Sequence, residues 1–112
     1  MKYNIIKTHD ELIKLTEKFP AVCFYLSTPQ CNVCKVLKPK VIELIENEFP
    51  QLKFFYIDLN DAKEITGQLS VFTVPTILVF LDGKELIRTS RNISIEQLKE
   101  QIKRYYQLIF SD

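Results

Sequence analysis

The chain has 112 residues, a length that suits a single domain spanning residues 1–112. Hydrophobic residues make up 46% of it, so a core can form without stabilising disulfides. Its 15 Lys and Arg residues nearly balance 14 Asp and Glu residues, whereas binding to nucleic acid or to an anionic membrane would require a basic excess, so we expect neither partner.

The first residues of the chain contain a weak strand candidate at residues 2–7 and no apolar core of a signal peptide. No apolar run approaches the roughly 18 residues that a membrane span needs. We therefore expect a cytoplasmic protein, in which a close cysteine pair is more often redox-active or metal-binding than structural. Thr8 with Glu11 forms a capping box that predicts the start of a helix, and Pro20 predicts its end.

Short apolar runs at residues 21–26, 54–57 and 76–81 predict strands that are buried on both faces of a sheet. Helical patterns lie between them at residues 34–45, which include Pro39, and at residues 61–68.

Two further patterns complete the predicted elements. Asp82-Gly83 predicts a hairpin turn, so residues 84–89 should run antiparallel to the strand before them. Ser94 with Gln97 forms a second capping box, and a helical apolar stripe then extends to Ile109. The predicted order is β-α-β-α-β-α-β-β-α, which indicates an α/β three-layer sandwich with a central mixed sheet and helices on both faces.

Cys31 and Cys34 follow the strand at 21–26 and open the helix at 34–45. Active sites of α/β sheets form at the C-terminal ends of such strands. At a helix N-terminus, free N–H groups and the helix dipole favour a thiolate and lower the pKa of a cysteine. The pattern therefore predicts a redox dithiol, in which Cys31 attacks a substrate disulfide and Cys34 resolves the mixed disulfide.

Several motifs in this order resemble the thioredoxin family along nearly the whole chain. They are C-N-V-C-K at 31–35 with Pro39, V-P-T at 74–76, D-G at 82–83 and S-I-E-Q-L at 94–98. The resemblance implies a thioredoxin-like fold with a cis bond between Val74 and Pro75 beside the two sulfurs. It also implies that the backbone of Val74 binds a substrate peptide as an added strand.

The resemblance further implies a function and partners. It indicates a monomeric thiol–disulfide oxidoreductase without a bound cofactor, which acts on disulfides of protein substrates. Its reductant would be a thioredoxin reductase or another dithiol donor. The residues expected to contact substrate around catalytic Cys31 and Cys34 are Gln30, Asn32, Val33, Val74, Pro75 and Arg91.

The sequence also departs from the family. Typical members carry W-C-G-P-C, whereas this chain has Q-C-N-V-C, so Gln30 removes an aromatic docking surface. Val33 replaces a proline that accompanies a strongly reducing potential in the family. A buried Asp–Lys pair of the family is replaced by Tyr25 and, by alignment, Phe54, and Arg91 replaces a glycine beside the substrate groove. We therefore expect weak turnover by a thioredoxin reductase and a higher reduction potential.

Other interpretations of the cysteines remain open at this point. The chain could be a non-catalytic binding module of the same fold with a vestigial C-x-x-C, or two chains could share an iron–sulfur cluster. A zinc site needs four ligands, and only His9 and Cys23 remain beyond the pair, so we expect no metal. Cys23 lies in the middle of a predicted strand, where cysteine is most often a small core residue.

Overall fold

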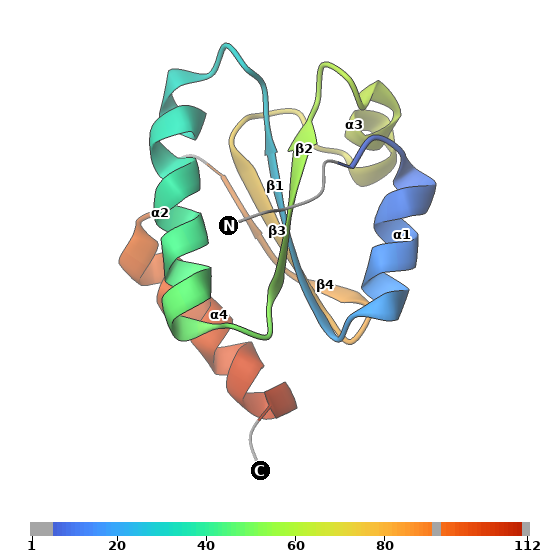
Figure 1. Ribbon diagram of the computed structural model, residues 1–112. Coiled ribbons are helices and arrows are strands. Elements are labelled where there is room, and N and C mark those ends of the chain that lie inside the picture. Colours follow the sequence, from blue (N-terminus) through green and yellow to red (C-terminus); the bar gives the residue numbers. More distant parts are fainter. Residues whose placement is uncertain (1–5, 91–92, 111–112) are drawn as a thin grey trace.

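The computed structural model describes residues 6–90 and 93–110 (Figure 1). The helices and strands follow the predicted order from the first helix onward. In chain order they are α1 (His9–Lys18), β1 (Ala21–Ser27), α2 (Asn32–Glu48), β2 (Lys53–Asp58), α3 (Lys63–Leu69), β3 (Thr76–Leu81), β4 (Lys84–Thr89) and α4 (Ile95–Phe110).

The described strands do not include the predicted strand at residues 2–7. Residues 2–5 lie outside the described residues, and Ile6 and Lys7 belong to no strand. The Ile6 N–H nevertheless donates to the carbonyl of Tyr56, at 3.1 Å. Because Tyr56 belongs to β2, this bond ties the chain before α1 to an outer strand of the described sheet.

The described strands form one mixed sheet in the order β2-β1-β3-β4. β1 pairs parallel with β2 and antiparallel with β3, and β3 pairs antiparallel with β4. All residues of β1 and β3 are buried, as their continuous apolar runs predicted. The C-terminal end of β1 therefore lies in the middle of the sheet, and the chain leaves it toward α2.

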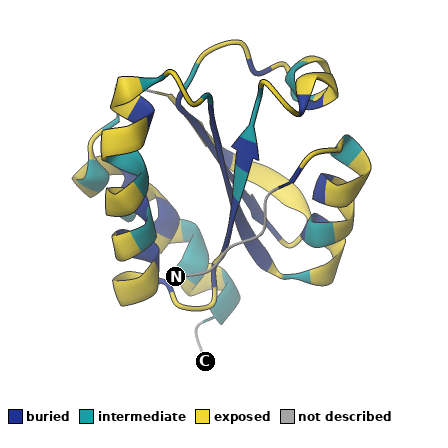
Figure 2. Ribbon diagram, turned by 45° about the horizontal axis from the view of Figure 1, so that its top comes forward, coloured by how far each residue is buried: buried dark blue, intermediate teal, exposed yellow. Residues whose placement is uncertain are grey.

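Helices cover both faces of this sheet, which confirms the predicted three-layer α/β fold (Figure 1). α2 and α4 lie on one face, where their side chains enclose a core that includes Tyr25, Cys34 and Leu98. α1 and α3 lie on the other, over a core that includes Leu12 and Phe24. Figure 2 shows the outer faces of the helices exposed and the central strands buried, whereas the outer strand β4 is largely exposed.

Local chemistry explains where several elements begin and end. Thr8 caps α1 through the predicted box with Glu11, and the Ser94 box with Gln97 has the same two reciprocal bonds before α4. Asp82 and Gly83 both have positive φ, of 55° and 80°, and make the tight turn between β3 and β4. Within the described residues, no helix is long and apolar enough to cross a membrane.

Candidate active site

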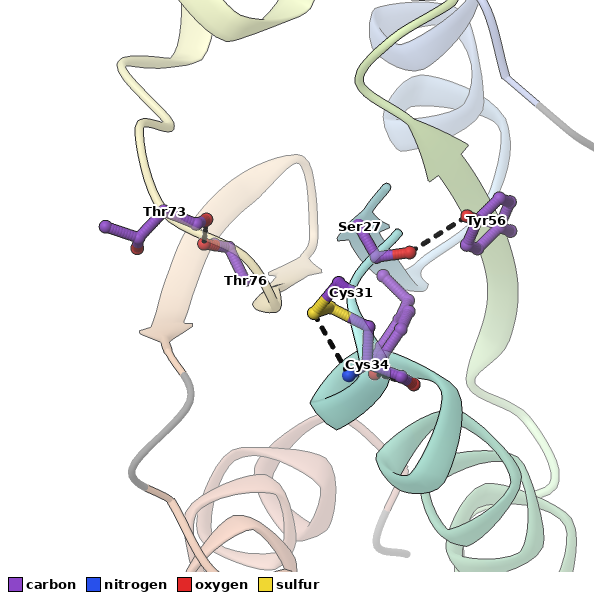
Figure 3. Close-up of a disulfide and its surroundings, with 7 residues drawn as sticks. Ser27, Cys31, Cys34, Tyr56, Thr73 and Thr76 are labelled. Atoms are coloured by element: carbon purple, nitrogen blue, oxygen red, sulfur yellow. Dashed lines mark hydrogen bonds between the residues drawn. A yellow bond between two sulfur atoms is a disulfide. The ribbon is translucent and has the colours of Figure 1, made fainter. Parts of the chain in front are cut away.

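The two cysteines lie where the sequence pattern predicts them, between the end of β1 and the start of α2. Cys31 is the N-cap of α2, and its N–H donates to the carbonyl of Thr28 at 3.1 Å, which closes a turn after β1. Cys31 and Cys34 form a disulfide with their Cα atoms 5.2 Å apart (Figure 3). The protein is therefore described in its oxidised form.

The two sulfur-bearing residues have different environments. Cys31 is partly exposed, whereas Cys34 is only 2% exposed and packs in the core beneath α2. The Cys34 N–H donates to the Cys31 sulfur at 3.1 Å (Figure 3). A donor at a helix N-terminus stabilises a sulfur that becomes negatively charged on reduction, and the first turn of α2 holds no acidic residue to oppose it.

The loop before β3 supplies the opposite wall of the site. The Val74–Pro75 peptide bond is cis, as the resemblance implied. Pro75 is buried, and Val74 is half-buried and packs against the same core as Cys31. The Thr76 hydroxyl donates to the carbonyl of Thr73 at 2.6 Å, which fixes the loop on both sides of the proline (Figure 3).

The remaining predicted site residues surround the disulfide, with one exception. Gln30, Asn32 and Val33 are exposed next to it in the chain. The Gln30 side-chain oxygen accepts from the Asn60 side-chain amide at 3.1 Å, so the loop after β2 holds this residue in place. Arg91 lies outside the described residues.

The layer beneath the dithiol is aromatic. Tyr25 is fully buried on β1, and its hydroxyl donates to the carbonyl of Cys34 at 2.7 Å. Burial, and to a lesser extent nearby Tyr56, raise the pKa of Tyr25 above its usual value. Its ring lies 6.1 Å from that of Phe54 and 6.4 Å from that of Tyr56, and the strand register places Tyr56 opposite Tyr25. Alignment with the family assigns the partner position to Phe54, which lies opposite Cys23 in the register and whose ring also packs against Tyr25.

The Tyr25 hydrogen bond to the dithiol helix is a feature that sequence reasoning missed. The available signal is a tyrosine at the position six residues before Cys31, where the family has a carboxylate. Another tyrosine hydrogen bond joins the end of β1 to β2: the Ser27 hydroxyl donates to the Tyr56 hydroxyl at 2.9 Å (Figure 3).

The third cysteine takes no part in the site. Cys23 is fully buried in the middle of β1, and desolvation raises its pKa to about 12, which keeps it a neutral thiol. This agrees with the predicted core role. Among residues 6–90 and 93–110, no three His, Cys, Asp or Glu side chains are grouped so that they could hold a metal ion.

Comparisons with known proteins agree with this geometry. A family model described as Thioredoxin matches residues 3–104. The thioredoxin-like protein YdfQ of Bacillus subtilis (strain 168) is 38% identical over 105 residues, which cover 94% of this chain and 84% of that protein. The thioredoxin of the same organism is 31% identical over 86 residues, covering 77% of this chain and 82% of that protein.

A solved structure gives the same result for the fold. A mutant thioredoxin from Halobacterium salinarum NRC-1 superposes with a TM-score of 0.82 at 23% identity, and the match covers 93% of this chain and 91% of that one. The family match over most of the chain, together with the C-x-x-C disulfide at the start of α2, shows that the protein belongs to the thioredoxin family.

Proposed function

We propose that the protein exchanges disulfides with protein substrates, with Cys31 as the attacking residue and Cys34 as the resolving residue. The chain is a thiol–disulfide oxidoreductase of the thioredoxin family. The observation that carries the assignment of roles is the C-x-x-C disulfide at the N-terminus of α2, which has one partly exposed and one buried residue. None of these findings favours a binding module with vestigial cysteines.

The proposed reaction uses the reduced dithiol. The Cys31 thiolate attacks one sulfur of a substrate disulfide, so that a mixed disulfide forms and the other substrate sulfur leaves as a thiolate. The Cys34 sulfur, deprotonated, then attacks Cys31, which restores the disulfide of the protein and releases the second substrate thiol. The substrate gains two electrons, and the protein dithiol loses them.

The surroundings of the disulfide support these roles. The Cys34 N–H already points at the Cys31 sulfur, and it would stabilise the thiolate that leaves when the disulfide is reduced. Attack by a bulky protein substrate requires the exposed sulfur, whereas closure of the ring requires only the neighbouring buried one. We propose that Gln30, Asn32, Val33, Val74 and Pro75 contact the substrate, and that Arg91 also does so.

We further propose that the protein acts as a monomer of one domain in the cytoplasm. Proteins with disulfides are its substrates, and a thioredoxin reductase or another dithiol donor returns it to the reduced form. No bound cofactor is needed, because the electrons reside in the two sulfurs.

Reduction of insulin disulfides by dithiothreitol, followed by turbidity, tests the activity. We expect the protein to accelerate precipitation, and a Cys31→Ser variant to have no effect. A Cys34→Ser variant should accumulate mixed disulfides with substrates that appear on non-reducing gels, whereas Cys31→Ser should not. A wild-type rate equal to that of dithiothreitol alone would reject the oxidoreductase and favour the binding module.

A further inference from the structure

A shallow groove on α2 begins at the C-x-x-C motif. It has a volume of about 390 Å³ and is lined by Asn32, Val33, Val36, Leu37 and Lys40. Val33 and Val36 are 48% and 61% exposed, which is unusual for two valines so close together. Residues three and four apart share one face of a helix, so this Val33–Lys40 groove runs along α2 away from the disulfide.

The charge of this region has one sign. Residues 28–42 contain three lysines, at positions 35, 38 and 40, and no Asp or Glu. Lys40 lines the groove and is exposed, and it forms no salt bridge within the described part of the chain. An apolar surface therefore leads from the disulfide to an unpaired ammonium group.

Acidic side chains limit this cationic region to the part of α2 near the disulfide. Glu43, one turn beyond Lys40, and Glu96 line a separate groove between α2 and α4 that Lys40 also borders. Asp58 and Asp61 belong to the segment around Asn60, which is bonded to Gln30 beside Cys31. Positive charge thus lies along α2 from the disulfide to Lys40, and acidic residues follow from Glu43 onward.

We propose that the Val33–Lys40 groove selects substrate segments with an apolar side chain beside the reacting half-cystine and an acidic residue about three positions from it. This inference rests on the proposed function and names its substrate class. Seven residues separate Val33 from Lys40, which is about 10 Å along a helix. An extended peptide covers that length in about three residues, at roughly 3.3 Å per residue.

The apolar part and the charged part of the Val33–Lys40 groove each fit one feature of such a segment. A leucine or valine of the substrate removes apolar surface of Val33 and Val36 from water. A carboxylate farther along reaches the Lys40 ammonium, which is attracted to it and repels a substrate lysine. Exposed ion pairs are individually weak, so the groove adjusts rates among substrates and does not decide whether exchange occurs.

Single-turnover exchange with short peptides tests this directly. The substrates are blocked heptapeptides with a central cysteine linked to 2-thiopyridine, leucines on both sides of the cysteine, and Glu, Gln or Lys at both ends. Pre-reduced protein, freed of reductant, attacks the peptide sulfur and releases pyridine-2-thione, which is followed by absorbance. The protein dithiol supplies both electrons, and each rate is divided by the rate with dithiothreitol, which corrects for intrinsic reactivity.

We expect the Glu peptide to react about three- to tenfold faster than the Lys peptide at low ionic strength, with Gln between them, and the ratio to approach one at high salt. Lys40→Glu should abolish or reverse the ratio. Lys14→Glu makes the same charge change on exposed α1, across the sheet, and should leave the ratio unchanged. Val36→Ser should slow the leucine peptides relative to peptides with glycine at those positions.

The outcomes distinguish failure of the groove proposal from failure of the proposed function. Equal normalised rates for the three peptides, or a ratio that survives Lys40→Glu, would overturn the groove proposal and leave the oxidoreductase intact. Failure to exchange with any peptide or with bis(2-hydroxyethyl) disulfide would overturn the proposed function, and the groove proposal with it.

Discussion

Replacing Tyr25 by Phe removes a buried hydrogen bond between the centre of the sheet and the dithiol helix. The hydroxyl donates to the Cys34 carbonyl at 2.7 Å, and the residue is fully buried. Phe keeps the ring and its contacts with Phe54 and Tyr56, so little cavity is created. The Cys34 carbonyl still accepts the helical hydrogen bond from the N–H of the residue four positions later. The expected loss is that of one net hydrogen bond, about 0.5–1.5 kcal/mol.

Urea unfolding of the oxidised protein at pH 7 measures this loss, and thermal unfolding should show a decrease of about 2–6 °C in Tm. Tyr105→Phe is the matched control, because Tyr105 is half-buried on α4 and its hydroxyl has no hydrogen bond within the described residues. Its stability should equal that of the wild type. Unchanged stability of Tyr25→Phe would show that the bond contributes nothing, and a loss above about 3 kcal/mol would show that the ring packing had changed.

The pH dependence gives an independent check. Burial raises the pKa of Tyr25 in the folded protein, so its contribution is complete below the pKa of an unfolded tyrosine, about 10, and is lost as pH rises above it. One pH unit above that value, ionisation of Tyr25 in the unfolded state lowers the free energy of unfolding of the wild type by about 1.4 kcal/mol. Tyr25→Phe has no such loss at this position. The wild type should therefore lose its advantage near pH 11, where Tyr25→Phe should be equally stable or more stable by up to about 0.9 kcal/mol. A difference that stays constant to pH 11 would contradict a buried, neutral Tyr25.

Four further outcomes follow from the site and its supports. Iodoacetamide should label Cys31 first in the reduced protein, because the start of α2 favours its thiolate and should hold the apparent pKa of the Cys31 thiol below about 7.5. Mass spectrometry identifies the labelled residue, and labelling of Cys23 first would contradict this. The reduction potential should lie near −250 to −200 mV, above the approximately −270 mV of thioredoxin, since Val33 replaces the family's proline, and equilibration with glutathione buffers measures it. NADPH oxidation with a thioredoxin reductase should show poor turnover, because Gln30 removes an aromatic docking surface; a low-micromolar KM would refute this. Arg88→Ala should lower the free energy of unfolding in urea by about 1 kcal/mol. The Arg88 guanidinium donates to the Leu69 carbonyl at 2.8 Å, which links the loop before Val74 to β4. A loss near zero would show that this link does not stabilise the protein.

Features set by neighbouring residues were predictable from the sequence. The capping boxes at Thr8 and Ser94 and the turn at Asp82-Gly83 depend on side chains within three positions of each other. The bounds of α3 were predicted less well, at 61–68 against Lys63–Leu69. Its N-cap, Ala62, has no side-chain hydrogen bond, so no sequence signal marked the start of this helix.

Contacts between distant segments could not be predicted in the same way. The Gln30–Asn60 bond joins residues that are 30 positions apart, and it depends on how the loops after β1 and β2 meet. The partner of Tyr25 depends on strand register. Phe54 and Tyr56 are two residues apart on one strand and so point to the same face, which leaves the apolar pattern unable to distinguish them. Only the observed pairing places Tyr56 opposite Tyr25.

This register bears on how protons move in the exchange. Tyr25 has a raised pKa and is neutral near pH 7, so it donates to the Cys34 carbonyl but cannot take a proton from the Cys34 thiol. A positioned general base is typically worth about 10²–10⁴ in rate, so the resolving step should be slow at pH 7 and should accelerate with pH as the thiol itself ionises. Tyr25→Asp alone would not repair this, because an unpaired buried carboxylate costs on the order of 3–5 kcal/mol. The compensating cation belongs on the same face of β2, at Phe54 or Tyr56, because both rings pack against Tyr25, with centroids 6.1 and 6.4 Å away.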